Sequence, residues 1–222
     1  MEKINYYNVM ADEFEKIKKE GRKPKLLMHV CCGPCSTFPL ELLDPLFNLT
    51  LYFNNSNIYP NDEYYRRLDE LKRFLDIFNE DKNEEDQVKV IITPYENEEY
   101  NKFLSIRKDD REGQERCFMC YERRMDEAMS YASMNNFDYF TTVMTISRQK
   151  NSQKLNEIGK KLSQKYPNVR YLFSDFKKKK GINRKEELTN LYQMYRQQYC
   201  GCVYSYNEYL RRLKEKEAKK QI

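Results

Sequence analysis

The residues best suited to do chemistry in this chain are its cysteines, which occur in three short clusters. Residues 31–35 read Cys-Cys-Gly-Pro-Cys, residues 117–120 read Cys-Phe-Met-Cys, and residues 200–202 read Cys-Gly-Cys. Two CxxC pairs and a CxC in one chain favour a metal site over structural disulfides. Thiolates suit either zinc or an iron-sulfur cluster, and the spacing alone does not separate the two. The cysteines therefore predict metal binding.

The chain has more cysteines than one metal site requires. There are seven, whereas a four-coordinate site uses four thiolates. The surplus suggests a cluster with an adjacent iron or zinc ion, or a cluster with a redox-active dithiol at Cys200 and Cys202. The alternative for this pair is a tight turn with two thiols that take no part in chemistry. Cys31 and Cys32 are adjacent in an extended segment, so we expect them to point to opposite sides and they need not share one metal.

The first two clusters are expected at the edge of a sheet. Residues 26–30 form a short apolar run that predicts a buried strand, and Gly33 and Pro34 cannot continue it. The cysteines therefore follow the carboxyl end of a strand, which is where open α/β sheets bind ligands. Cys117 and Cys120 open a predicted helix and lie on neighbouring positions of one of its faces. Thiols from separate segments are expected to meet at this edge.

Strands and helices alternate along the whole chain. Strands are predicted at 26–30, 48–53, 88–93, 138–143 and 169–173. Helices are predicted at 6–19, 35–43, 62–78, 117–135, 151–165 and 184–198, and a last helix runs from the 200–202 turn to about 218. A charged loop is predicted at 105–116. This order predicts an α/β fold with a doubly wound, mostly parallel sheet and extra C-terminal helices. We expect a single domain over 1–222, with an N-terminal helix within 1–20, a catalytic core at 25–200 and a basic C-terminal helix at 203–222.

The composition limits which classes of protein this chain can belong to. The 222 residues are 40% hydrophobic, which is enough for a buried core, and no apolar run approaches the length of a membrane span. The N-terminus lacks the apolar segment of a secretory signal, so we expect a cytoplasmic protein whose thiols stay reduced. The net charge is +5, and the four lysines at 177–180 could attract a phosphate backbone or form a solvated surface. There is no glycine-rich phosphate loop, so ATP and NAD are not expected.

Few residues could donate a proton in the predicted site. His29 is the only histidine, and its place in the predicted strand makes a satisfied core imidazole at least as reasonable as a catalytic one. A proton donor must then be Tyr, Asp, Glu, Cys or water. Tyr121, beside Cys120, is the preferred candidate, and a packed aromatic ring is its alternative.

Several motifs resemble the QueH family of epoxyqueuosine reductases, over roughly residues 25–207. The matching segments are 29–35; Asn57 and Pro60 with Glu63, Tyr64 and Arg67; 116–121 with Arg124; 140–142; 175–178 with Gly181; and 195–205. The resemblance implies reduction of epoxyqueuosine to queuosine at the wobble position of tRNA, by an iron-sulfur enzyme without cobalamin. It also implies an adenine nucleotide alpha hydrolase-like (HUP) fold, with the thiol turn where relatives bind a nucleotide.

This resemblance gives the thiols provisional roles. We predict a four-iron four-sulfur (4Fe-4S) cluster held mostly by Cys32, Cys117 and Cys120, with Cys31 and Cys35 completing it or binding an adjacent iron or zinc ion. Removing an epoxide oxygen needs electrons, protons and a Lewis acid or proton donor. The residues expected to take part in catalysis are Cys31, Cys35, Tyr121, Cys200 and Cys202, the last two as a relay or as ligands of the second metal.

The expected partners are a tRNA that carries epoxyqueuosine and an electron donor protein or other reductant, without a membrane. Phosphate contacts position an RNA but do not specify its sequence. The residues predicted to bind the substrate are Asn57, Arg148, Lys150, Lys177 and Lys178.

Two other functions use similar parts. A tRNA thiolation enzyme can combine a related fold with a cysteine-bound cluster, but it needs an ATP-binding glycine-serine loop after the first strand, where this chain has the residue 31–35 cluster. A zinc-stabilised RNA-binding module would have no catalysis. Metal analysis and a nucleoside assay distinguish these functions.

Overall fold

A five-stranded parallel sheet lies at the centre of the structure, a computed structural model that describes residues 3–220. In spatial order the strands are β3 (Lys89–Ile92), β2 (Asn48–Phe53), β1 (Lys25–His29), β4 (Tyr139–Thr142) and β5 (Arg170–Tyr171). Every neighbouring pair runs parallel. The predicted α/β class and the doubly wound parallel sheet are confirmed.

The strand order reverses between β1 and β4. The chain builds β1, β2 and β3 in one direction and then returns to place β4 and β5 on the other side of β1. At such a switch point the connections after the two strands diverge and leave a crevice at the carboxyl edge. The turn at Cys31 follows β1, and the 3-10 turn η2 (Val143–Ile146) follows β4. The first cysteine cluster therefore borders the crevice.

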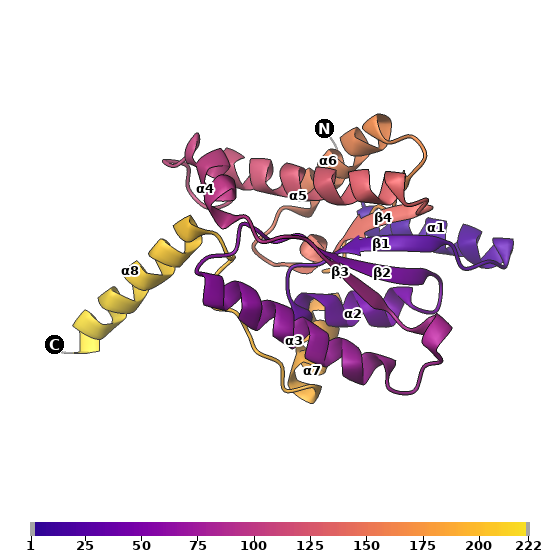
Figure 1. Ribbon diagram of the computed structural model, residues 1–222, viewed down its shortest axis with the longest axis horizontal. Helices are drawn as coiled ribbons and strands as arrows, with labels where there is room; N and C mark the ends of the chain where they lie inside the picture. Colours follow the sequence, from indigo (N-terminus) through magenta and orange to yellow (C-terminus); the bar gives the residue numbers. More distant parts are fainter. Residues whose placement is uncertain (1–2, 221–222) are drawn as a thin grey trace.

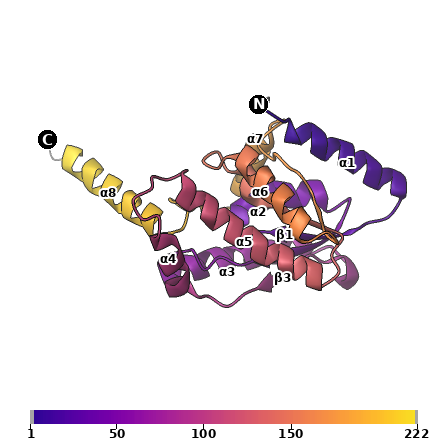
Figure 2. The same ribbon diagram turned by 90° about the horizontal axis from the view of Figure 1, so that it is seen from above.

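The side chains of β1 alternate between two layers of core. Leu26 and Met28 pack with α1 (Tyr6–Glu20), α2 (Gly33–Leu43) and α3 (Asn61–Asn79). Leu27 packs on the other face with α5 (Glu115–Met134) and α6 (Ser152–Lys165). This is the period of two expected of a strand that is buried on both faces. Figure 1 shows α2 and α3 below the sheet and α5 above it, and Figure 2 shows α5 and α6 crossing over the sheet.

Three α-helices or β-strands differ from the prediction by more than two residues in length or were not predicted. α4 (Asn97–Ser105) was not predicted, because only Tyr100 and Leu104 of its residues are buried and they give a weak helical pattern. β5 has two residues instead of five, because its ladder with β4 covers only Arg170 and Tyr171. The helix predicted at 184–198 ends as α7 (Gly181–Leu191), since Gln193 adopts a left-handed conformation. η1 (Glu84–Asp86) is a short 3-10 turn before β3.

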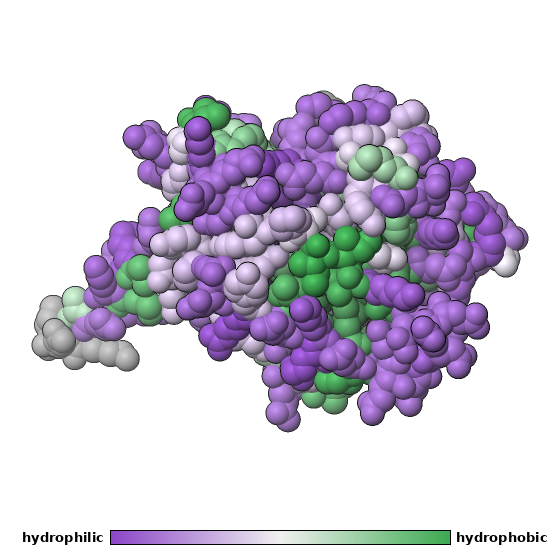
Figure 3. Space-filling model, viewed as in Figure 1, coloured by the Kyte–Doolittle hydropathy of each residue, from purple (hydrophilic) through white to green (hydrophobic). Residues whose placement is uncertain are grey.

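The surface is uneven in polarity. α8 (Val203–Lys220) extends away from the body of the molecule (Figures 1 and 2). Figure 3 shows an apolar patch in the middle of one face, between α3 and α5, where the edge strand β3 leaves Ile92 40% exposed. Every helix within residues 3–220 is too short or too polar to cross a bilayer. The first two residues, in the predicted N-terminal segment, and the last two of the predicted C-terminal helix lie outside the described residues.

Candidate metal and active site

The turn between β1 and α2 gathers three sulfur atoms. The Sγ atoms of Cys31, Cys32 and Cys35 all lie within 4.8 Å of one another. Our expectation that Cys31 and Cys32 point to opposite sides is wrong, because the chain leaves the strand after His29 and bends at Cys31. The Ser36 hydroxyl donates a hydrogen bond of 2.8 Å to the Cys32 carbonyl oxygen and holds the turn. The three thiols can therefore share one metal centre.

The three thiols share their protons unequally. Hydrogen bonds from the Cys32 and Cys35 thiols lower the pKa of Cys31 well below its ordinary value. Donating to Cys31 in turn raises the pKa of Cys32, and it raises that of Cys35 to about 12. The group therefore loses one proton easily and retains the others. A bound metal replaces such protons, since thiolates and not thiols are metal ligands.

A second set of thiols lies where α5 meets the C-terminal segment. Cys117 Sγ accepts a hydrogen bond of 3.2 Å from the Gly113 amide, and burial raises the pKa of Cys117 to about 11. Cys200 and Cys202, with Cys120, also raise this pKa through their charges, so the four thiols lie within electrostatic range of one another. Cys117, Cys200 and Cys202 line a cavity of about 660 Å³. The predicted ligand set of Cys32, Cys117 and Cys120 stays a prediction, because the closest-packed group is the one after β1.

Two cations lie against the sulfur atoms. Arg124 is 2% exposed and donates to Asn55 Oδ1 at 2.7 Å and to His29 Nε2 at 3.1 Å. Lys150 Nζ lies 3.5 Å from Cys200 Sγ. Within residues 3–220, neither side chain forms an ion pair with a carboxylate. Burial opposes both charges, yet the Cys120 and Cys31 thiolates raise the pKa of Arg124, and those of Cys200 and Cys31 raise the pKa of Lys150. Cysteine sulfurs are therefore the groups whose negative charge, once they are deprotonated, offsets both cations.

His29 is a satisfied core imidazole. Its ring is fully buried, with Nδ1 2.8 Å from Thr142 Oγ1 and Nε2 3.1 Å from Arg124 Nη2. Arginine can only donate, so Nε2 accepts and the proton is on Nδ1, which donates to Thr142. Burial lowers the pKa of His29 well below its ordinary value and keeps the ring neutral. Of the two interpretations of this residue, the structure supports the one without proton transfer.

Tyr121 lies inside the layer of core between α5 and α6. It is 3% exposed, and burial raises its pKa. The charges of Lys150 and Cys200 both act on its hydroxyl, which places Tyr121 beside the second set of thiols. Its role as a proton donor stays a prediction.

The five residues predicted to bind the substrate are in different environments. Asn57 is 2% exposed, and its Oδ1 has no hydrogen-bond partner in residues 3–220. Lys150 points to Cys200, and Lys177 Nζ donates to the Lys150 carbonyl oxygen at 2.9 Å. Lys178 and Arg148 are exposed. Lys150, Lys177 and Lys178 line one cavity of about 570 Å³.

A buried ion pair on α3 fixes the turn that contains Cys200. Arg67 Nε lies 2.7 Å from Glu63 Oε1, and the two side chains are 1% and 8% exposed. The Arg67 guanidinium also donates to the carbonyl oxygens of Tyr199 at 3.1 Å and Cys200 at 2.9 Å. Glu63 and Arg67 stand one helical turn apart, and both lie in one of the segments that resemble the QueH family. The sequence does not indicate which backbone carbonyl oxygens the Arg67 guanidinium would bind. We call this arrangement the Arg67 clasp.

An Arg67→Met variant should lower the free energy of unfolding by about 3 kcal/mol, because it leaves the Glu63 carboxylate buried without its counter-charge, with only the Tyr195 hydroxyl at 2.9 Å as a hydrogen-bond donor. Urea denaturation measures this loss. The double variant Glu63→Leu with Arg67→Met should lose less than the single variant, since no charge is left unpaired. An equal or larger loss in the double variant would contradict the prediction.

Gln197 lies in the matching segment 195–205, but its residue type and spacing indicate no role of its own. Its Nε2 donates to Cys32 Sγ at 3.1 Å and reaches the first thiol cluster from the segment after α7. Met194, three residues earlier, covers the same turn. A Cβ added at Gly33 would lie 2.6 Å from the Met194 Cε atom, so any larger residue at position 33 would require the Met194 side chain to move. The C-terminal segment therefore closes over the turn after β1.

Comparison with known proteins agrees with this geometry. The family model for epoxyqueuosine reductase QueH matches residues 26–208. The chain is 41% identical over 204 residues to epoxyqueuosine reductase QueH of Streptococcus pyogenes serotype M1, covering 92% of this chain and 79% of that protein. It is 41% identical over 206 residues to that of Staphylococcus aureus strain Mu50, covering 92% and 85%. It is 30% identical over 186 residues to that of Thermotoga maritima, covering 81% and 89%. The chain therefore belongs to the QueH family of epoxyqueuosine reductases.

Proposed function

We propose that this chain reduces epoxyqueuosine to queuosine in tRNA, the last step of queuosine biosynthesis, with an iron-sulfur cluster bound at the carboxyl edge of its sheet. The observation that carries the proposal is the group of three sulfurs within 4.8 Å at the switch point, in a chain of this family. The tRNA substrate also supports a cytoplasmic location.

The donor set fits a metal-thiolate centre. Sulfur ligands, the buried Arg124 and the half-buried Lys150, neither of them paired with a carboxylate in residues 3–220, suit a centre whose overall charge is negative. Arg124 Nε and Asn57 Oδ1 are buried and unpartnered in residues 3–220, so polar atoms remain free beside the thiols. We assign Cys32, Cys117 and Cys120 to a 4Fe-4S cluster, with Cys31 and Cys35 completing it or holding an adjacent iron or zinc ion.

The reaction needs two electrons and two protons, because both carbon-oxygen bonds of the epoxide break, an alkene forms and the oxygen leaves as water. A bound cluster supplies electrons that originate in a donor protein or other reductant, and an iron with an open position acts as a Lewis acid. Tyr121 keeps its proton in its buried position and offers it as a hydrogen bond. Cys31, Cys35, Cys200 and Cys202 take part in the reaction at the mouth of the site. Lys150 places a positive charge beside Cys200.

Anaerobic purification tests the cofactor. A brown protein that contains iron and acid-labile sulfide supports the proposal, whereas a colourless protein with stoichiometric zinc supports the RNA-binding module. The metal-loaded protein is then incubated with a reductant and tRNA that carries epoxyqueuosine, and the nucleosides are analysed. We expect queuosine to replace epoxyqueuosine. Persistence of epoxyqueuosine with a fully loaded cluster would overturn the proposal, and a thiolated nucleoside would support the thiolation enzyme.

A further inference from the structure

The cavity beside Cys117 is lined by two segments of the chain, which we call its walls, and by three cysteines. One wall is the charged segment 108–116, and the other is the first half of α8. Cys117, Cys200 and Cys202 lie at its base, and its volume of about 660 Å³ is in the range of sites that hold one small organic group. The space between the two walls therefore leads to these sulfurs.

Positive charge dominates the lining. Five basic side chains face three acidic ones. Arg116 is used internally, because its guanidinium donates to the carbonyl oxygens of Arg107 at 3.2 Å and Lys108 at 3.0 Å and lies 4.1 Å from the centre of the Tyr204 ring. The other four basic side chains are exposed at the rim: Lys108, Arg111, Arg211 and Arg212. Both walls therefore contribute exposed cations, of which Arg211 and Arg212 form exposed ion pairs within α8.

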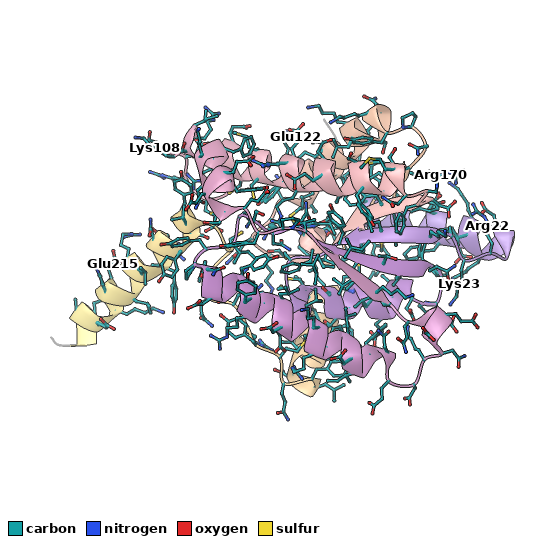
Figure 4. The ribbon with its side chains drawn as sticks, in the orientation of Figure 1. Arg22, Lys23, Lys108, Glu122, Arg170 and Glu215 are labelled. Carbon is teal, nitrogen blue, oxygen red and sulfur yellow. The ribbon has the colours of Figure 1, made fainter. Side chains whose placement is uncertain are left out.

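α8 is attached to the molecule at one end. Ser205 is its only buried residue among 203–219, and the Arg211 and Arg212 side chains are 59% and 63% exposed. Both arginines pair with Glu208 on the same helix, and these exposed pairs hold the chain helical but contribute little energy. Figures 1 and 2 show the helix extending away from the sheet, and Figure 4 shows Glu215 on α8 and Lys108 on the separate segment above it.

We propose that segment 108–116 and α8 are the two walls of a docking surface for the anticodon arm of tRNA, with one nucleoside extruded into the cavity. This inference rests on the proposed function. An enzyme that acts on one base of a folded RNA takes that base out of its stack. Lys108 and Arg111 on one wall, and Arg211 and Arg212 on the other, bind the phosphates on either side of the extruded nucleoside. Tyr204 lines the cavity and offers a ring for stacking.

The cavity favours RNA over an acidic protein partner. The group that enters must reach the three cysteines that line the cavity. A space of about 660 Å³ admits one nucleoside but not a folded domain. A flexible single-stranded loop can present one nucleoside and keep its phosphates at the rim. The four rim cations match this arrangement.

The test measures the affinity of the full-length protein for a synthetic anticodon stem-loop RNA at several salt concentrations. Two double variants remove the walls separately: Arg211→Gln with Arg212→Gln, and Lys108→Gln with Arg111→Gln. We expect each to raise Kd roughly tenfold and to reduce the slope of log K against log salt by about 2, because two phosphate contacts are lost. The matched control is Arg22→Gln with Arg170→Gln, whose side chains are 51% and 65% exposed at the far end of the molecule (Figure 4). Its Kd should stay within about twofold of the wild type.

The outcomes separate this inference from the proposed function. Far-UV circular dichroism checks that α8 stays helical in the Arg211 and Arg212 variant, and the other wall gives an independent result because its residues lie outside α8. Wild-type binding that neither double variant weakens would overturn the docking surface. So would unchanged RNA binding with a raised KM for the electron donor, because the rim would then belong to an acidic protein. A metal-loaded wild-type protein that reduces no epoxyqueuosine contradicts the proposed function itself.

Discussion

A Cys117→Ala variant is expected to lose its bound metal and its reductase activity together, while the sheet remains folded. Cys117 is 9% exposed in the first turn of α5, at the point where the second set of thiols meets the cavity. Residues that only support metal ligands already cost about ten- to a hundredfold when changed, so removing a ligand should cost more than roughly a hundredfold in activity. Iron and sulfide per chain, the rate of queuosine formation and far-UV circular dichroism are measured on the same preparation.

The control for this variant lies at the other end of the same helix. Met134 is 72% exposed, and Met134→Ala should keep wild-type metal content and activity. If Cys117→Ala retained both, Cys117 would not be a ligand. If it lost metal and also the circular dichroism signal of the sheet, the loss would be one of folding, and Cys117→Ser would then replace it in the test.

A Lys150→Met variant is expected to lower the rate of reduction at least tenfold and to shift the midpoint potential of the metal centre to a more negative value. The Lys150 ammonium lies 3.5 Å from Cys200 Sγ and pairs with no carboxylate in residues 3–220. Two unit charges roughly 4 Å apart interact by about 4 kcal/mol at an effective dielectric constant of about 20, which makes a tenfold effect a conservative expectation. Removing the cation disfavours the reduced state, because that state has the more negative charge. A spectroscopic redox titration measures the shift.

Lys150→Arg should keep most of the potential, because it keeps the positive charge. Lys161→Met is the control for removing a lysine elsewhere, since Lys161 is 70% exposed on α6 and pairs with Glu122. An unchanged potential in Lys150→Met at full metal content would show that this cation does not act on the centre. Lys150 would then be expected only to bind tRNA.

Local sequence signals predicted the elements that position the first two thiol clusters. β2 has the predicted bounds, and β1, α5 and α6 differ from theirs by one or two residues, because each has a clear apolar period and a recognisable end. The predicted edge of the sheet also holds the first cluster, since Gly33 and Pro34 mark where β1 has to stop.

The rest depended on contacts between distant segments. The end of α7 is set by the left-handed turn at Gln193, after which Met194 packs over Gly33. No local pattern around Gln193 indicates that packing. The side chains of Cys31 and Cys32 converge because the chain bends at Cys31. The alternation of side chains along a strand does not apply at such a bend. The Arg67 clasp joins α3 to backbone that lies far along the chain, so its role is visible only in three dimensions.

The Arg67 clasp also bears on when the site can first exist during synthesis. β1 and its three thiols leave the ribosome long before Tyr199 and Cys200, whose carbonyl oxygens complete the clasp. Until then the turn after β1 lacks Gln197 and Met194, and a nascent chain exposes reactive sulfur to oxidants and stray metal ions. Closure of the turn after β1 by Gln197 and Met194 is therefore a late event in the synthesis of the chain.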